Sequence, residues 1–340
     1  SNDNGNNNAD DKEIGLDISN VEIDTSDTPL AMQVTLLESV EQCFSSGRKD
    51  VQENAMKTIY EIIQNCGHVL KDGWAVLLKL LSNVATEHPD LVSLGFKSVQ
   101  LIADDFLGNL ELNVEKYFID NNNDDDDDDD DEEEQGDNKQ EEEEEKKEKG
   151  GDIGSFLLCI KCLADYAMQL ADVNISLTAI GTLWAVGDHA RQQMNNDSKV
   201  ANAIWIIVLK QLELLSLNDR APVRNCALQT MFTTLVTHGE FFSMKTWGKC
   251  IAVDGIVFGV MDGIERKCTL GDNEEKNSNK KNDGEDDYMI VHHSRDTTAK
   301  QWNETRVIAM KELSRTIRSF FAKLNDMEFF GIMWAEILNI

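Results

Sequence analysis

The sequence predicts an all-α protein, an α-solenoid of HEAT- or armadillo-like helical pairs with long disordered acidic inserts. Apolar residues recur at helical spacing along most of the 340 residues, and no segment shows the period-two alternation of a half-buried strand. The three prolines, at positions 29, 89 and 222, each stand where a helical pattern begins. Proline is tolerated there because its missing N–H would have no partner within the helix.

The first repeats are expected within residues 28–119, after an Asn-, Asp- and Gly-rich segment, residues 1–27, that should be disordered. The helical patterns of this region cover residues 29–45, 48–64 and 73–85, followed by a helix from Pro89 to about Phe106. Gly67 is a C-cap signal and Asp72 a candidate N-cap. The first and third patterns begin about 43 residues apart, near the HEAT or armadillo period of about 40 to 47.

Residues 120–151 form an acidic insert between two sets of repeats. Residues 120–149 hold 19 acids and four lysines, so they contribute −15 of the net charge of −31. Like charges repel, and few apolar groups are present to offset the entropy of ordering. We expect a disordered loop whose removal leaves the fold intact.

A second set of repeats is expected within residues 152–263, with helical patterns over 153–170, 174–193 and 198–215, a further helix from Asp219, and another over 246–261. The run from Asp219 to Ala227 resembles the start of the second helix of a HEAT repeat. In this motif Asp219 can cap the helix and Pro222 pre-sets its first turn. Val223 should face the core, and Arg224 should reach carboxylates of the adjacent repeat.

Residues 264–287 are expected to be a polar loop, and residues 288–340 to be HEAT-like helices. In that last part, a helix should begin near Asp296 and end near Leu324. The pattern of the final helix, over 328–340, looks truncated. The six tryptophans lie in apolar stripes and are expected in the core: Trp74, Trp184, Trp205, Trp247, Trp302 and Trp334.

Composition argues against several classes of function. An acidic chain lacks the basic face that nucleic-acid phosphates require, and charge alone would not hold it to an anionic membrane. The seven cysteines read as reduced cytosolic thiols. Cys159 and Cys162 have redox or metal spacing, but no second pair or nearby histidine accompanies them, so a core role is favoured.

The stretch from His292 to Thr305 opens a helical pattern and concentrates polar side chains. Its neighbouring His, Ser and Asp residues cannot all point at one another, which argues against a catalytic triad. We expect no catalytic, cofactor or metal site. Two interpretations remain: Asp296 caps the helix, or the stretch contacts a partner protein. The candidate contact residues are His292, His293, Arg295, Asp296, Lys300, Gln301 and Glu304.

The same stretch, residues 292–305, closely resembles a signature of the Mon-two family, which is related to the large Arf exchange factors with a Sec-seven domain. Residues 174–184 and 220–239 also resemble stretches of this family. Residues 73–74 and 101–107 resemble blocks shared more widely with BIG-type Arf exchange factors. One departure is Asn225, where the family pattern has a strongly basic position.

The resemblance implies a large cytoplasmic α-solenoid, attached peripherally to trans-Golgi network and endosome membranes, that acts in endosome-to-Golgi vesicle traffic without a catalytic domain. It implies as partners a Dopey-type protein, an Arf or Arf-like GTPase and an aminophospholipid flippase, and it leaves homo-oligomer formation open. Two alternatives remain: a regulatory helical segment of a BIG-type Arf guanine-nucleotide exchange factor, and a HEAT-repeat cargo adaptor.

Overall fold

The computed structural model describes residues 30–112, 154–193, 198–281, 297–327 and 330–339, and within these ranges all regular secondary structure is helical. Most helices form consecutive pairs. The pairs are α1 (Leu30–Phe44) with α2 (Lys49–Cys66), α3 (Gly73–Val84) with α4 (Pro89–Leu101), α7 (Ser155–Met168) with α8 (Val173–Gln193), α9 (Ser198–Ser216) with α10 (Ala221–His238), and α12 (Ile256–Lys281) with α13 (Thr298–Asn325).

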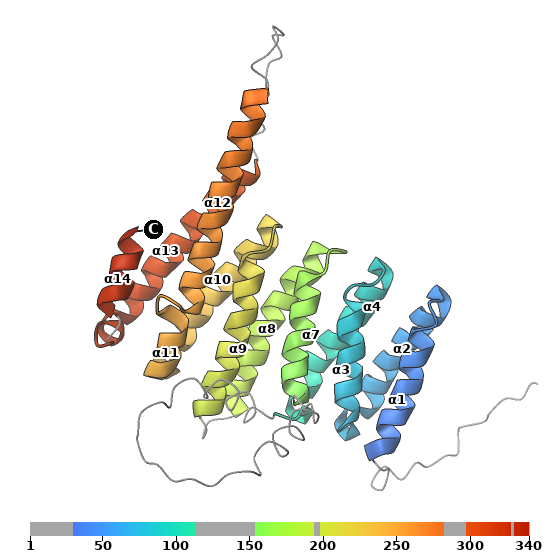
Figure 1. The fold of residues 1–340 in the computed structure, drawn as a ribbon. Helices are drawn as coiled ribbons and strands as arrows, with labels where there is room; N and C mark the ends of the chain where they lie inside the picture. The colour runs from blue at the N-terminus through green and yellow to red at the C-terminus, as the bar shows by residue number, and fades with distance from the viewer. Residues whose placement is uncertain (1–29, 113–153, 194–197, 282–296, 328–329, 340) are drawn as a thin grey trace, which may run out of the picture.

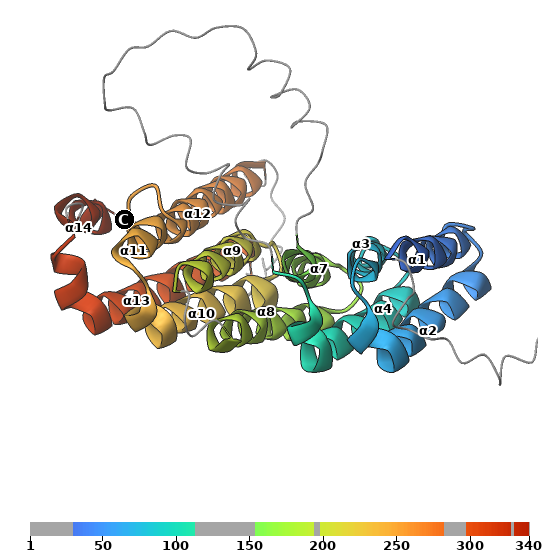
Figure 2. The ribbon, with the colours of Figure 1, turned by 90° about the horizontal axis from the view of Figure 1, so that it is seen from below.

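The pairs stack side by side into a two-layered solenoid (Figure 1). Helices α1, α3, α7, α9 and α12 lie in one layer and α2, α4, α8, α10 and α13 in the other (Figure 2). Each helix packs against its own partner and the adjacent helices of its layer, so one apolar core runs through the stack. The predicted all-α solenoid is confirmed, whereas the HEAT-like character of its repeats stays a prediction.

The stack continues across the expected acidic insert because α7 packs directly beside α3. The chain segments on either side of residues 113–153 are joined by two hydrogen bonds. The Phe156 amide donates to the Glu111 carbonyl oxygen at 2.9 Å, and the Glu111 amide donates to Ser155 Oγ at 2.7 Å. The two ends of the insert are therefore held together by the folded part of the chain. The segments expected to be disordered, 1–27 and 120–151, lie outside the described residues.

The single helix expected over residues 246–261 is wrong. Two helices occur there, α11 (Met244–Ile251) and the start of α12, separated by a tight turn. In this turn the Gly255 amide donates to the Ala252 carbonyl at 2.7 Å, and a Cβ on Gly255 would lie 2.8 Å from that oxygen. Only glycine fits so close to the backbone, so this residue allows the break.

The polar loop expected over residues 264–287 is wrong for residues 264–281, which continue α12 as far as Lys281. Helix α12 projects beyond its neighbours in Figure 1. Ile264 and Cys268 lie one helical turn apart and are both buried, so the apolar stripe of the helix extends past the expected boundary. Residues 282–287 lie outside the described part of the chain.

Helix ends were harder to predict than helix positions. Asp72 occupies the N-cap position of α3, but its side chain makes no capping hydrogen bond. Gly67 ends α2 in right-handed rather than left-handed geometry, and a Cβ there would meet the Phe106 ring at 2.5 Å. Its role is close packing. Helix α4 passes into a π-helical turn, Ile102–Phe106, rather than ending as a regular α-helix.

Candidate protein-interaction surface

Helix α13 carries the described part of the predicted contact stretch. Its N-cap is Thr297, with extended backbone (φ −84°, ψ 154°), and the Thr297 hydroxyl accepts the Lys300 amide N–H at 3.3 Å. The expected cap, Asp296, is therefore wrong by one residue: Thr297 satisfies the amide three residues further on, as an N-cap side chain does. Of the predicted contact residues, His292, His293, Arg295 and Asp296 lie outside the described residues.

The three described contact residues differ in exposure. Lys300 and Glu304 are exposed and stand four residues apart on one side of α13, whereas Gln301 is half-buried. The exposed side continues along α13, with residues spaced alternately by four and three, and the helix kinks at Phe320, where the backbone leaves helical geometry (φ −122°, ψ 18°). These residues, which we call the α13 stripe, are Lys300, Glu304, Val307, Lys311, Ser314, Arg318 and Phe321, all of them exposed. The exposed side thus continues 14 residues beyond Glu304 to Arg318, roughly 21 Å of helix, and Phe321 follows the kink.

The opposite side of the same helix fixes α13 to α10 through Arg224. The Arg224 side chain is fully buried, and its Nε donates to Thr305 Oγ1 at 2.9 Å. Its guanidinium lies 4.1 Å from the ring centroid of Trp302, which is 2% exposed. The expected core position of Trp302 is confirmed. The expectation that Arg224 reaches carboxylates is wrong, because a hydroxyl, a carbonyl and an aromatic face surround it.

Asp219, the first residue of the predicted repeat motif, contacts this arginine. Asp219 does not cap α10, whose N-cap residue is Arg220. Instead its carbonyl accepts Arg224 Nη1 at 2.7 Å and its carboxylate pairs with Lys267 at 2.8 Å. Burial lowers the pKa of the Arg224 guanidinium, and the negative charge of Asp219 opposes that effect. Pro222 in the first turn of α10 and Val223 in the core are as predicted.

Asn225, the departure from the family pattern, is part of the same contact. Its Oδ1 accepts a hydrogen bond from the Thr305 hydroxyl at 2.8 Å. The position therefore works as a neutral acceptor between α10 and α13.

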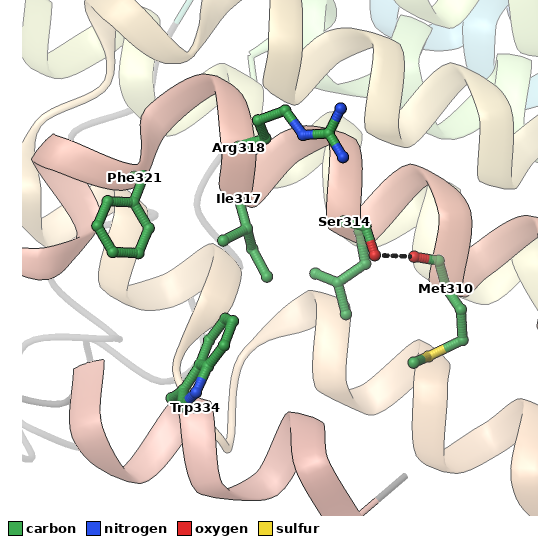
Figure 3. A pocket seen from close by; sticks show the side chains of 7 residues that line it. Met310, Ser314, Ile317, Arg318, Phe321 and Trp334 are labelled. Atoms are coloured by element: carbon green, nitrogen blue, oxygen red, sulfur yellow. Dashed lines mark hydrogen bonds between the residues drawn. The ribbon is translucent and has the colours of Figure 1, made fainter.

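An open apolar groove lies between α13 and α14 (Phe330–Asn339), at the end of the α13 stripe (Figure 3). Its volume is about 330 Å³. Arg318 and Ser314 are its polar lining residues, and the remaining ones are Met310, Leu313, Ile317, Phe321 and Trp334. Sequence reasoning missed this groove. The available signal was the Phe320–Phe321 pair followed by a short apolar helix.

Two large aromatic side chains at the groove are unusually exposed. Phe321 is 50% exposed and Trp334 is 42% exposed, so the expected core position of Trp334 is wrong. Both contact Phe330: the Phe321 ring meets it edge-on at 5.6 Å, and the Trp334 ring stacks on it at 6.0 Å. This aromatic row helps attach α14 to α13, and it leaves parts of the outer two rings open to solvent.

Helix α13 differs in charge from the rest of the chain. It contains six Lys and Arg residues and two Glu residues, a net charge of +4 by subtraction, whereas the whole chain carries −31. Arg306 pairs with Glu265 at 3.0 Å and Arg315 with Glu312 at 3.2 Å. Lys323 donates to three carbonyls that follow α10, the shortest bond being 2.7 Å to Phe242 O. Lys311 and Arg318 are exposed on the stripe.

The two cysteines with redox or metal spacing lie in the core. Cys159 and Cys162 are fully buried in the core, as predicted, and burial raises the pKa of the Cys159 thiol to about 12. No cluster of three or more potential metal-binding side chains occurs in the part of the chain that the structure describes. Nor does any helix in that part combine the length and apolar character needed to span a bilayer.

Comparison with known proteins places similarity at both ends of the chain. Residues 198–340 match the family described as the C-terminal region of Mon2 protein, and residues 27–101 match the Mon2/Sec7/BIG1-like HDS family. The MON2 homolog of Drosophila melanogaster is 22% identical over 332 residues, and that of Homo sapiens is 23% identical over 346. These alignments cover 91% and 92% of this chain but 17% of each relative.

A more distant relative belongs to the exchange-factor branch. The Brefeldin A-inhibited guanine nucleotide-exchange protein 3 of Arabidopsis thaliana is 22% identical over 249 residues, which cover 65% of this chain and 12% of that protein. No solved structure matches the chain.

Proposed function

Since this chain belongs to the Mon-two family, we propose that it serves as part of a non-catalytic scaffold in endosome-to-Golgi vesicle trafficking. The observation that carries this proposal is the pair of family matches, to residues 27–101 and 198–340, at the two ends of one continuous solenoid. A stacked solenoid presents a long surface and buries its core between repeats, which suits binding rather than chemistry.

The scaffold is expected to lie on the cytoplasmic side of trans-Golgi network and endosome membranes as a peripheral protein. Its proposed partners are a Dopey-type protein, an Arf or Arf-like GTPase and an aminophospholipid flippase. The matched Mon2/Sec7/BIG1-like region and the Arabidopsis relative support a connection with the Arf pathway. The α13 stripe supports a role in contacting proteins, because it combines exposed charge with exposed apolar side chains.

The second candidate is a regulatory helical segment of a BIG-type exchange factor, which the similarity to the Arabidopsis exchange protein favours. The two candidates differ in one measurable activity. The full-length protein that contains this chain should leave nucleotide exchange on Arf-family GTPases unchanged if it is a scaffold, and should accelerate exchange if it is an exchange factor. The remaining alternative, a HEAT-repeat cargo adaptor, is distinguished by a different measurement, since such a protein should bind basic localisation peptides.

Proximity labelling in cells with the intact protein tests the scaffold proposal. Wild type would be compared with two variants: His293→Ala/Arg295→Ala/Asp296→Ala, and Lys300→Ala/Glu304→Ala. A matched control is Lys57→Ala/Glu61→Ala, which removes an equally spaced exposed pair from α2. Helical content and thermal stability would be verified for each protein before comparison.

We expect wild type and the α2 control to label Dopey-like or Arf-family proteins, and at least one of the two variants within residues 293–304 to lose one of them. Equal labelling by all four proteins would keep the scaffold role and remove the stretch from the contact surface. Absence of any trafficking protein from the wild-type sample would refute the proposed function.

A further inference from the structure

We propose that the groove between α13 and α14 binds an amphipathic helix of a partner protein, with apolar side chains in the groove and acidic side chains against Lys311 and Arg318. The inference rests on the proposed scaffold function and specifies the chemistry of one partner. It joins three observations about the described residues: an open apolar groove, a basic helix in an acidic chain, and the spacing of the α13 stripe.

The groove presents apolar surface that is exposed among the described residues. Phe321 and Trp334, which line the groove, are 50% and 42% exposed. In Figure 3 the Trp334 side chain projects toward Ile317 and Phe321 across open space. Contiguous exposed apolar surface with a polar rim is typical of an interaction site. A volume near 330 Å³ is at the low end of the range for ligand pockets, about 300 to 1,000 Å³, which suits a few projecting side chains.

The charge around the groove selects the partner. Helix α13 carries a net charge of +4 in a chain of −31, and Arg318 lines the groove itself. Lys311 stands seven residues before Arg318 on the same exposed stripe, so the two cations lie about 10.5 Å apart along the helix axis. Carboxylates seven residues apart on a second helix match this separation. Complementary charge steers the encounter and fixes the register of the bound helix.

The geometry of the stripe favours a helix over an extended peptide. Alternating steps of four and three residues form the seam along which α-helices pack on one another. Ser314 lies midway between the two cations and is small, and its hydroxyl is bonded to the Met310 carbonyl of its own helix at 2.8 Å. A helix can therefore approach closely at this position without leaving the hydroxyl group unpaired.

Two other occupants fit less well. In a symmetric contact between two copies of this chain centred on the groove, near Ser314, Lys311 of one copy would lie opposite Arg318 of the other, so like charges would meet. An anionic membrane would attract these cations, but the net charge of the chain is strongly negative and opposes approach to such a surface. An amphipathic acidic helix would pair with Lys311 and Arg318 and also cover the apolar residues of the groove.

The test uses the full 340-residue chain and a fluorescein-labelled synthetic peptide of 18 residues. The peptide has a Leu stripe at helical spacing and Glu residues seven apart beside it. One comparison peptide carries Lys in place of these Glu residues, and another carries Ser in place of Leu. Binding would be measured by fluorescence anisotropy, and helix formation by circular dichroism.

Three variants separate charge from shape. Lys311→Glu/Arg318→Glu reverses the rim, and Ser314→Trp fills the groove from an exposed position. Lys57→Glu/Lys97→Glu is the matched control, since it makes the same charge change at exposed positions of α2 and α4.

The acidic peptide should bind wild type and the control equally, and at least about tenfold more weakly to the rim reversal and to Ser314→Trp. The Lys peptide should show the opposite preference between wild type and the reversal. Equal binding of the Glu and Lys peptides to wild type would overturn the proposal, as would an unchanged affinity in the rim reversal. Two other results would also overturn it. One is a dimer, detected by sedimentation, that covers the groove, and the other is binding of phosphatidylserine vesicles that the acidic peptide does not displace. Such a failure would leave the proximity-labelling result of the scaffold function untouched.

Discussion

Replacing Arg224 by alanine should loosen α13 from the solenoid. This fully buried side chain of α10 contacts α13 and the segment before α10. It donates to Thr305 Oγ1 at 2.9 Å and to the Asp219 carbonyl at 2.7 Å, and its guanidinium lies 4.1 Å from the ring centroid of Trp302. Its Nη2 atom has no hydrogen-bond partner among the described residues. The arginine therefore makes strong contacts, but the burial of its unpaired Nη2 still costs free energy.

The size of the effect follows from these terms. A hydrogen bond to a charged donor contributes about 1.5 to 3 kcal/mol, and a desolvated cation–π contact about 2 kcal/mol. Removing a buried guanidinium also relieves a desolvation penalty of several kcal/mol, so the contributions do not simply add. We expect Arg224→Ala to lower the free energy needed to detach α13 from α10 by about 3 kcal/mol. Arg224→Met, which keeps the apolar stem against Trp302, should cost about 1 to 2 kcal/mol.

Amide hydrogen exchange measured by mass spectrometry gives a local readout, which suits a repeat protein whose units can open separately. A loss of about 3 kcal/mol predicts exchange in α13 that is faster by about a hundredfold, with α3 and α4 unchanged. Thr305→Val removes the hydroxyl partner, and its effect should be non-additive with that of Arg224→Met by about 1 kcal/mol. Arg315→Ala, which removes an exposed ion pair with Glu312, is the control and should change stability by less than about 0.5 kcal/mol.

The reasoning would be refuted if Arg224→Ala left α13 exchange within about threefold of wild type. Additive effects of the Arg224 and Thr305 substitutions would separately refute the role of the hydroxyl bond.

Three further outcomes are expected. Replacing residues 113–153 by a short Gly/Ser linker should leave the melting temperature within about 2 °C, because Glu111 is bonded across the two ends of that segment; a larger fall would contradict this. A thiol reagent at neutral pH should label exposed Cys43 in the folded protein but reach buried Cys159, whose thiol pKa is raised to about 12, only after unfolding; mass spectrometry of labelled peptides decides this. Stability should fall on acidification below pH 6.5 because burial lowers the pKa of His238, so the unfolded chain takes up a proton that the folded chain resists. His238 alone can contribute at most about 1.4 kcal/mol per pH unit to this slope. Urea titrations at several pH values should show a smaller pH dependence of stability for His238→Gln than for wild type.

Much of the fold followed from local pattern. The expected ranges 198–215 and 174–193 agree with α9 and α8 to within one residue, because apolar spacing and breaker residues act over a few positions. The same logic failed where a distant contact decided the outcome. Residues 264–281 looked polar, yet Ile264 and Cys268 bury in the core and extend α12. Gly67 looked like a helix stop, whereas its smallness accommodates Phe106.

The candidate surface divides in the same way. The sequence indicated the stretch that opens α13 and the exposed Lys300 and Glu304, whereas capping by Asp296 proved wrong. A contact role for the stretch stays a prediction. The groove could not be predicted, since a cavity is defined by which side chains from two helices fail to fill the space between them, and no local pattern records that.

By itself, the sequence determined an all-helical solenoid, the positions of most helices, the core role of Trp302 and the resemblance to the Mon-two family. The tertiary structure alone decided that Arg224 packs on Trp302 and bonds Thr305, 81 residues away, and that the α13 stripe ends in an apolar groove. The physical reason is range. Helix propensity and amphipathic spacing act within one or two turns, whereas a buried arginine's partners and an unfilled groove depend on how separate helices meet.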